Sequence, residues 1–550
     1  MKRTAQDILN FVEDNDVKFA KLTFCDIFGN QKNVSLFASE LPRAFAEGVS
    51  FDGSSIAGFM NVEESDLVLW PDPDTATVLP WRPTEGRVIR MYCDITLPNG
   101  KPFEGNCRGY LQSVIKRARA MGLVCNVGCE CEFYLFETDE HGSPTRIPLD
   151  IGGYFDIPPL DKGENIRREI CFAIEEMGLH PEHSHHESGH GQNEVCFRYT
   201  TALKSADNLN TFKSTVKAIA ARNGLFASFM PKPLANQPGS GLHVNVSLLR
   251  DGKNLFDGAF TPDSEAGHFV AGILAHAREL TAFCNPVPNS YARLGANEAP
   301  LYVSWSRQNR SQLVRLPSAH GEFCRVELRG PDPAGNPYLV IGLILAAGLD
   351  GIEHSLPLPE AVNRNLFHPS AAAGLDSLPR TLREAITVAG QSEFISRELP
   401  VALMNKYFLS SLCLLALNSA QADDAAPSLM LPAASVTAPE VEIESIDLKT
   451  ATSAGSRLNL TGLETPASVE SLTGAQIRAR GDRSVQDAVT RTTGISNTGT
   501  PGNGGSAYSA RGFVGEGSVM QLYDGVRMYS GAGTVTFPVD DWSVERIDVL

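Results

Sequence analysis

The chain has 550 residues, of which 42% are hydrophobic and 20% are charged, so its composition is that of a globular protein long enough for several domains. The formal net charge of -17 at pH 7 argues against nucleic acid as the main partner. Ten of the eleven cysteines precede residue 403 at irregular spacing, mostly within apolar runs. This pattern favours reduced, buried thiols in a cytoplasmic protein, and the first residues lack the apolar run of an export signal.

The start of the chain predicts a small α+β unit. Thr4-Ala5-Gln6-Asp7 is typical of a capping box that opens a short amphipathic helix. Residues 17–24 and 31–36, which are separated by a turn, have the composition of a β-hairpin. Asp52 follows in a turn-rich segment that, taken alone, indicates only a loop.

Residues 127–136 alternate between apolar and polar side chains and predict a strand that places Glu130 and Glu132 on one face. Neighbouring carboxylates repel each other, and they are tolerated best where a cation lies between them. Oxygen ligands of this kind suit Mg²⁺ and Mn²⁺. A solvated strand face would explain one such pair equally well. Zinc held by nearby cysteines is disfavoured because no second cysteine pair completes a tetrahedral set.

Two later segments offer further ligands for a cation. The His-rich tract 183–194 contains Glu187 and Glu194, although such tracts are usually solvated loops. The Gly-rich turn 238–241 leads into a strand that carries His243. A lone histidine on a strand is more often structural, and the turn lacks the lysine and the spacing of a P-loop.

Amphipathic or apolar periodicity predicts helices at 109–123, 164–178, 208–223 and 338–349. The last of these is very apolar but too short to span a bilayer, which indicates a buried core helix. Arginines are concentrated over a short span of this acidic chain, and their planar guanidinium groups suit an anionic substrate. They are Arg293, Arg307, Arg310, Arg315, Arg325 and Arg329. Surface salt bridges are the plainer explanation for any one of them.

Taken together, motifs along roughly residues 1–400 resemble the glutamine synthetase family, bacterial type I in particular. These motifs are Phe51-Asp52-Gly53-Ser54-Ser55, Glu130-Cys131-Glu132, His186-Glu187 with Gly191-Gln192-Asn193-Glu194, Gly239-Ser240-Gly241-Leu242-His243, Asn289-Ser290-Tyr291 with Arg293, Glu298-Ala299-Pro300, Asn309-Arg310-Ser311, and Arg325-Val326-Glu327-Leu328-Arg329 with Pro331-Asp332-Pro333. The resemblance implies an α+β fold, with an N-terminal β-grasp domain at 1–103 and a catalytic domain at 104–403 whose curved antiparallel sheet holds two divalent ions, Mg²⁺ or Mn²⁺.

The same resemblance implies the reaction and the residues that perform it. The enzyme would be a glutamate–ammonia ligase, in which L-glutamate takes a phosphoryl group from ATP and ammonia then displaces phosphate from the γ-glutamyl phosphate. The implied roles are Glu132, Glu187 and Glu194 for one metal ion; Glu130, His243 and Glu327 for the other; Gly239, Arg293 and Arg329 for the substrate; Arg310, Arg315 and Arg325 for ATP; and Asp52, Glu298, Arg310 and Arg329 for catalysis. Asp52 would act in the site of a neighbouring subunit, so a homo-oligomer, typically a dodecamer, is expected.

Two positions depart from the family pattern and leave the amine acceptor open. Pro238 occupies a place where many members carry asparagine, and Asn245 occupies a place where they often carry histidine. Ligation of glutamate to an amine other than ammonia is therefore the alternative within the same reaction class.

From residue 404 the chain changes character. Met404-Asn405-Lys406, an apolar run and Ala420-Gln421-Ala422 predict a signal peptide at 404–422 in the interior of the chain. An ordinary core helix is the alternative, but it would not explain the small residues at 420–422 or the linker rich in alanine and proline that follows. A linker is expected at 423–450. Residues 451–550 then contain Glu464-Thr465-Pro466-Ala467-Ser468-Val469, a helix-like stretch at 476–490, Ala510-Arg511-Gly512-Phe513, Asp524-Gly525-Val526-Arg527 and Val544-Glu545-Arg546-Ile547-Asp548-Val549-Leu550. These segments resemble the plug domain of TonB-dependent outer-membrane receptors, a small α+β domain that implies TonB and an outer-membrane barrel as partners.

The two parts imply different compartments, so we interpret the chain as a composite. We expect a cytoplasmic ligase that lacks its family's last helices, with weakened assembly, joined to the truncated start of an exported receptor. A ligand-binding module within 423–550 is the alternative function from another class, in which a plug helps to bind a siderophore.

Overall fold

The structure is a computed structural model that describes residues 2–82, 85–258 and 260–420 and short stretches between 470 and 549. Contacts divide the chain into two compact units, Met1–Ala426 and Pro427–Leu550. The expected linker 423–450 and residues 421–422 of the expected signal segment lie outside the described residues.

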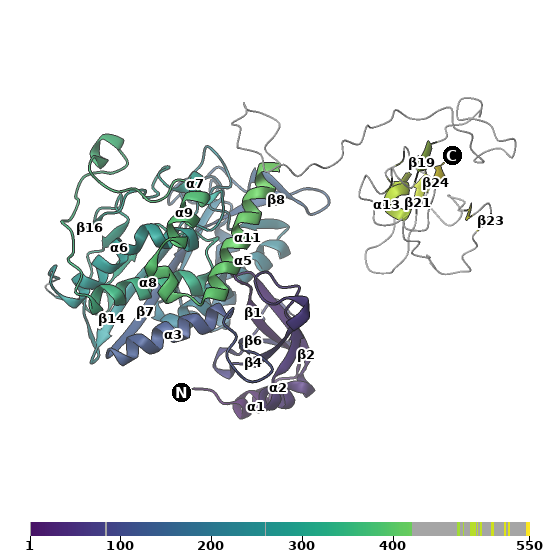
Figure 1. Cartoon of the computed structure of the whole chain (residues 1–550), viewed down its shortest axis with the longest axis horizontal. Coiled ribbons are helices and arrows are strands. Elements are labelled where there is room, and N and C mark those ends of the chain that lie inside the picture. Colours follow the sequence, from purple (N-terminus) through teal and green to yellow (C-terminus); the bar gives the residue numbers. More distant parts are fainter. Residues whose placement is uncertain are drawn as a thin grey trace. The chain divides into compact units, whose positions relative to one another are not determined.

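The N-terminal part of the first unit is a mixed sheet covered by two helices (Figure 1). Its strand order is β2-β1-β6-β4-β3, with β5 paired to β6 and with β1 and β6 parallel. The capping box is present, since Thr4 Oγ1 accepts from Asp7 N–H and the Asp7 carboxylate accepts from Thr4 N–H. The elements are α1 (Ala5–Asp14), β1 (Val17–Cys25), β2 (Gln31–Phe37), α2 (Leu41–Glu47), β3 (Val49–Asp52), β4 (Asp66–Pro71), β5 (Thr77–Val78) and β6 (Arg87–Thr96).

Two further sheets form the frame of the catalytic part. The larger sheet has the order β12-β7-β14-β18-β17-β16, with β15 paired to β14. It is antiparallel except that β16 and β17 run parallel, so the curved sheet is mixed and not purely antiparallel. Its strands are β7 (Leu123–Cys131), β12 (Thr200–Thr201), β14 (Leu242–Arg250), β15 (Lys253–Asn254), β16 (Trp305–Arg307), β17 (Val314–Leu316) and β18 (Val326–Leu328).

The smaller sheet has the order β10-β11-β8-β13, with β9 paired to β8. Its strands are β8 (Phe133–Thr138), β9 (Pro144–Pro148), β10 (Pro181–His186), β11 (Gln192–Phe197) and β13 (Leu225–Ser228). The single strand expected at 127–136 is therefore wrong: it breaks at Glu132, where the chain leaves β7 and enters β8 in the other sheet. The alternation within β7 is as expected, with Val127, Cys129 and Cys131 buried.

Helices cover these sheets, and α8 lies at the centre of the core. The helices of this part are α3 (Cys107–Ala120), α4 (Glu164–Glu176), α5 (Ala202–Arg222), α6 (Glu265–Cys284), α7 (Ser290–Arg293), α8 (Pro337–Glu353), α9 (Leu382–Gly390), α10 (Glu393–Glu398) and α11 (Val401–Ala420). Helix α8 packs against α3, α5 and α6 and is buried from Pro337 to Gly351, as its apolar sequence predicted. Of the helices in the described part of the chain, none has the length and apolar character to cross a membrane.

Arg108 of α3 links the N-terminal sheet to the catalytic part. Its guanidinium group donates to Asp72, Asp94 and Asp207, and the Asp207 carboxylate also accepts from the hydroxyl of Tyr338. The side chains of Arg108 and Asp207 are 4% and 7% exposed. A buried cation with several carboxylate partners fixes the relative position of the elements that carry them.

The expected signal segment begins inside α11, and the start of this helix packs into the catalytic core. Leu403 and Tyr407 are buried, and the Tyr407 ring lies 4.7 Å from that of Phe283 and 5.5 Å from that of Phe28. Its hydroxyl donates to the carbonyl of Ala282. These are the contacts of a core helix at the start of α11, and the signal peptide at 404–422 stays a prediction.

In the second unit the structure describes short pieces of an α+β arrangement. Strand β19 (Glu470–Thr473) pairs antiparallel with β24 (Arg546–Val549), and Leu472, Ile477 and Ala488 form a small core. The other described elements are α13 (Val485–Thr490), β20 (Ile495–Asn497), β21 (Tyr508–Ala510), β22 (Leu522–Tyr523) and β23 (Val526–Arg527).

Candidate active site

Three adjacent strands of the larger sheet bring Glu130, His243 and Glu327 together. His243 on β14 lies opposite Glu130 on β7, and Asn245 lies opposite Glu327 on β18. His243 Nδ1 is 3.1 Å from Glu130 Oε2 and 3.9 Å from Glu327 Oε1. One ligand atom from each of the three residues lies within 4.8 Å of the others, which is a spacing that a single cation can bridge.

Arginines surround this first cluster. Arg315 Nη1 donates to Glu327 Oε2 over 2.7 Å, and Arg329 Nη1 donates to Glu327 Oε1 over 2.6 Å. Asn245 joins Arg325 to Glu130, because its carbonyl accepts from Arg325 and its amide donates to Glu130 Oε1. Burial alone would raise the pKa of Glu130, but the hydrogen bond and charge of His243 outweigh it and lower the pKa to about 2.

The smaller sheet forms a second cluster, made of His185, Glu187 and Glu194. His185 Nε2 lies 2.8 Å from Glu187 Oε1 and 3.5 Å from Glu194 Oε2. Sequence reasoning missed His185. The spacing of His185 and Glu187, two positions apart around the end of β10, could have indicated a shared face, since side chains alternate along a strand.

Glu132 lies next to this second cluster but outside its closest group of atoms. Its Oε2 accepts from the amide of Gln192 over 3.0 Å and from the backbone N–H of Gly241 over 2.8 Å. Burial and the charge of Glu187 raise its pKa, against the lowering effect of His243. The structure thus places Glu132 as a neighbour that faces the same charged region.

The electrostatics of the second cluster fit a divalent cation. Burial raises the pKa of Glu194 well above its usual range, and the charges of Glu130 and Glu132 raise it further. Carboxylates buried this closely stay ionised only when a cation compensates their charge, and otherwise at least one of them takes up a proton. Each cluster offers the carboxylate oxygens of two glutamates and one imidazole nitrogen. Such ligands suit Mg²⁺ or Mn²⁺, so the residues present fit two divalent ions, one at each cluster.

The Gly-rich turn lies against Arg293. Arg293 is 3% exposed and donates to the carbonyls of Gly330 and Arg329. A Cβ atom on Gly241 would lie 2.8 Å from Arg293 Nη2 and 3.0 Å from His243 Nε2, and one on Gly239 would lie 2.8 Å from Arg293 Cγ. Only glycine leaves the backbone this close to both side chains.

Tyr154, which sequence reasoning also missed, marks where Glu298 and Arg310 lie. Burial raises the pKa of the Tyr154 phenol, the charges of Glu187, Glu194 and Glu298 raise it further, and that of Arg310 lowers it. The side chains of Glu298 and Arg310 are exposed, and their charges act on the same phenol as those of the second cluster. Asp52 is different: its carboxylate accepts from Ser54 N–H, and it shares no described hydrogen bond or ion pair with either cluster.

Cysteines contribute to neither cluster. The ten cysteines whose side chains are described are free thiols, and nine of them are buried. No group of potential metal ligands among the described residues includes a cysteine, so the structure offers no support for a zinc site at Cys125, Cys129 and Cys131.

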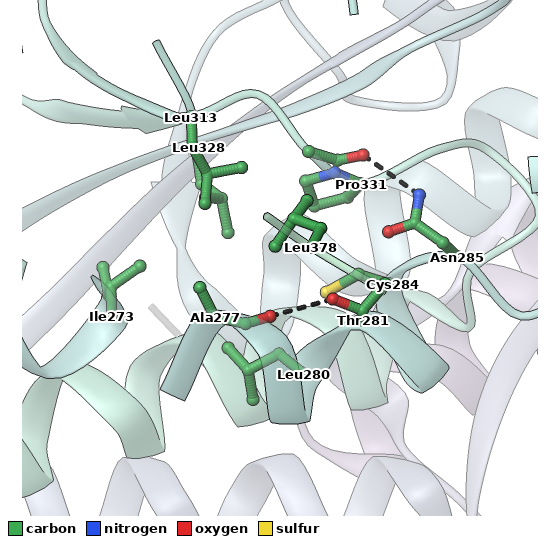
Figure 2. A pocket seen from close by; sticks show the side chains of 11 residues that line it. Ile273, Ala277, Leu280, Thr281, Cys284, Asn285, Leu313, Leu328, Pro331 and Leu378 are labelled. Carbon is green, nitrogen blue, oxygen red and sulfur yellow. Dashed lines mark hydrogen bonds between the residues drawn. The ribbon is translucent and has the colours of Figure 1, made fainter. Parts of the chain in front are cut away.

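A separate small pocket lies between α6 and the segment after β18 (Figure 2). Its lining is mainly apolar, with Ile273, Leu280, Leu313, Leu328 and Leu378 among its residues. Its lining contains none of the predicted site residues, but it includes Gly330, whose carbonyl accepts from Asn285 and Arg293.

Comparison with known proteins gives the same assignment for most of the chain. Residues 16–98 match the β-grasp domain of glutamine synthetase, residues 104–411 match its catalytic domain, and residues 461–550 match the TonB-dependent receptor plug domain. The glutamine synthetase of Clostridium saccharobutylicum is 47% identical over 410 residues, which cover 72% of this chain and 92% of that protein.

Two further comparisons extend this result. The glutamine synthetase of Methanosarcina mazei is 47% identical over 412 residues, 74% of this chain and 92% of that protein. A solved complex of GmaS with ADP superposes with a TM-score of 0.70 at 31% identity and covers 76% of this chain and 97% of that one. The chain belongs to the glutamine synthetase family, and its residues 461–550 are similar to the TonB-dependent receptor plug domain.

Proposed function

We propose that the glutamine synthetase unit of this chain is a glutamate–ammonia ligase that uses ATP to form glutamine. The observation that carries the proposal is the pair of clusters, Glu130–His243–Glu327 and His185–Glu187–Glu194, with Arg293, Arg315 and Arg329 around them. Two cation sites beside several buried or half-buried guanidinium groups suit a transferring phosphoryl group and a dicarboxylate substrate.

In this proposal Glu130, His243 and Glu327 hold one divalent ion, and Glu187 and Glu194 hold the other with His185 and Glu132 beside them. Mg²⁺ or Mn²⁺ at these positions would neutralise charge on phosphate oxygens. Arg293 and the backbone at Gly239 bind the glutamate α-carboxylate side, while Arg310, Arg315, Arg325 and Arg329 bind ATP and the phosphoryl oxygens.

The chemistry proceeds in two steps. An oxygen of the glutamate γ-carboxylate attacks the γ-phosphorus of ATP, and ADP leaves with the electrons of the broken P–O bond. Ammonia then attacks the carbonyl carbon of γ-glutamyl phosphate, and phosphate leaves with the electrons of the C–O bond. Glu298, which is exposed near Tyr154, would help to exclude water from the acyl phosphate.

Ammonium has to lose a proton before it attacks, and we assign this task to Asp52 of a neighbouring copy. The backbone N–H of Ser54 lowers the pKa of Asp52, so the side chain is a carboxylate that attracts ammonium. Within one copy, Asp52 shares no described hydrogen bond or ion pair with either cluster. This supports a homo-oligomer in which Asp52 reaches a neighbouring site, and a dodecamer is the expected form.

The free thiols of the protein and the proposed use of ATP favour the cytoplasm.

The test is phosphate release from ATP by the full chain with L-glutamate and Mg²⁺ or Mn²⁺, with ammonium, with methylamine and with neither. Turnover that depends on ammonium supports the proposal, and a clear preference for methylamine would support ligation to another amine. Absence of turnover with every amine would contradict both. The plug-like part takes no part in this reaction, because every proposed site residue precedes residue 330.

A further inference from the structure

The loop at residues 150–161, which connects β9 to α4, begins and ends with an aspartate in a buried ion pair. Asp150 Oδ1 lies 2.8 Å from His186 Nε2, and both side chains are 0% exposed. Asp161 receives both terminal nitrogens of Arg167, at 2.5 and 3.1 Å, and these side chains are 2% and 5% exposed. Neither pair contributes an atom to the two clusters described above.

These residues do not form a third cation site, although Asp150, Asp161 and His186 are close enough to do so. Asp150 already accepts from the backbone N–H groups of Gly191 and Lys162. Both ring nitrogens of His186 face oxygen atoms, since Nδ1 lies 2.6 Å from the carbonyl of Glu187, so neither offers a free lone pair. Arg167 supplies the compensating positive charge for Asp161.

The ion pairs lie on the opposite face of the β10–β11 hairpin from the second cluster. In the register of these strands His185 faces Glu194 and the next pair is His186 with Asn193. Because side chains alternate between the two faces, His185 and Glu194 point to one side and His186 and Asn193 to the other. Arg167 also donates to Asn193 Oδ1 over 2.6 Å. Both ion pairs therefore contact the face of the hairpin that carries His186 and Asn193.

The same loop also contacts the opposite face of the hairpin, the one that carries His185. The ring of Tyr154 lies 5.6 Å from that of His185, edge to face, and the ring of Phe155 lies 4.8 Å from it. Phe155 N–H donates to the carbonyl of His186, and Phe155 has a φ of 61°, a conformation that bulky residues rarely adopt. Because this backbone conformation is strained, the surrounding contacts must hold Phe155 in position.

We propose that the pairs Asp150–His186 and Asp161–Arg167 are positioning residues that clamp the 150–161 loop to the β10–β11 hairpin. The clamp sets the spacing of His185, Glu187 and Glu194 and keeps Tyr154 and Phe155 over His185. This inference rests on the proposed function, in which Glu187 and Glu194 hold a divalent ion. In this role Asp150, His186, Asp161 and Arg167 touch no substrate or metal ion, and they orient the side chains that would hold the ion.

The experiment measures Mn²⁺ binding to the full chain by electron paramagnetic resonance, together with the melting temperature. Asp161→Asn removes one charge of a pair and should weaken one of the two Mn²⁺ sites by about 10- to 100-fold, the usual effect of removing a partner behind a metal ligand. Asp207→Asn is the matched control, because Asp207 is an equally buried partner of Arg108 that has no described contact with the hairpin. It should lower the melting temperature and leave both Mn²⁺ affinities unchanged.

Arg167→Lys is the second variant, and it tests the clamp if Asp161→Asn fails to fold. Lysine keeps the charge but cannot reach Asp161 and Asn193 together, so we expect a smaller loss of affinity at the same site. Wild-type affinity in both variants would overturn the clamp while leaving the proposed function intact. Absence of Mn²⁺ binding by the wild-type chain would instead overturn the proposed function and the clamp with it.

Discussion

Arg329 Nη1 donates to Glu327 Oε1 over 2.6 Å, and this contact joins the first cluster to the arginines around it. The two residues stand two positions apart at the end of β18, so their side chains point to the same face. Arg315 binds the other carboxylate oxygen of Glu327. In the proposed function, a cation at this cluster would share Glu327 with two guanidinium groups, and a phosphoryl group bound there would lie near all three positive charges.

Replacing Arg329 tests this arrangement. Arg329→Gln removes a donor aimed at the transferring phosphoryl group and should lower kcat by about 100- to 1000-fold, the range for losing one donor that stabilises a transition state. Steady-state kinetics with ATP, glutamate and ammonium measure the change. The exposed Arg307, whose guanidinium contacts the carbonyl of Phe260, is the matched control. If Arg307→Gln and Arg329→Gln behaved alike, the role given to Arg329 would be wrong.

Metal removal should abolish turnover without unfolding the protein. Excess EDTA should stop phosphate release, and added Mn²⁺ should restore it. Mn²⁺ should also raise the melting temperature, since a ligand at about 100 times its Kd stabilises the folded state by about 2.7 kcal/mol.

Glu187→Gln should lose part of the Mn²⁺-dependent rise, because it removes a carboxylate from the second cluster. Glu182→Gln serves as the control, because Glu182 is exposed on β10, the strand that ends just before Glu187. This variant should keep the full rise in melting temperature. An equal rise in the wild type and in Glu187→Gln would count against a metal ion at Glu187.

His276 should make stability depend on pH. Burial alone would lower its pKa, but hydrogen bonds to Glu279 and Asp350 outweigh burial and raise the pKa above its ordinary value of 6.5. A raised pKa in the folded state means that the stabilisation is complete below 6.5 and is lost as the pH rises through the folded-state pKa. The wild type should therefore lose stability between about pH 6 and about pH 8.5 through this residue.

Urea unfolding of His276→Gln at both pH values measures this effect. The variant should be weaker than the wild type mainly at the lower pH, so its stability should change less with pH. His141→Gln is a suitable control because the His141 side chain is 80% exposed and its ion-pair partner Glu140 is 87% exposed. A wild-type pH profile in His276→Gln would refute the linkage.

Helix α11 offers a test of where the catalytic core ends. Tyr407 is 1% exposed between aromatic rings, so Tyr407→Ala should lower the free energy of unfolding of the first unit by about 3–5 kcal/mol. Leu409 on the same helix is 64% exposed, and Leu409→Ala should change it by less than about 0.5 kcal/mol. Equal effects of the two substitutions would show that the helix does not pack as described.

Local sequence was sufficient for features that depend on near neighbours. The capping box at Thr4, the hairpin of β1 and β2, and the buried helix α8 follow from side chains a few positions apart, and each is present. The family motifs likewise led to the two-domain ligase and to the plug domain.

Other features arise only when distant segments meet. The break at Glu132 depends on β7 and β8 pairing with different partners, which alternation along one strand cannot indicate. His185 joins Glu187 and Glu194 only because the β10–β11 register sets it opposite Glu194. The aspartates at the two ends of the 150–161 loop find His186 and Arg167 through folding, because a buried charge needs a partner wherever in the chain that partner lies.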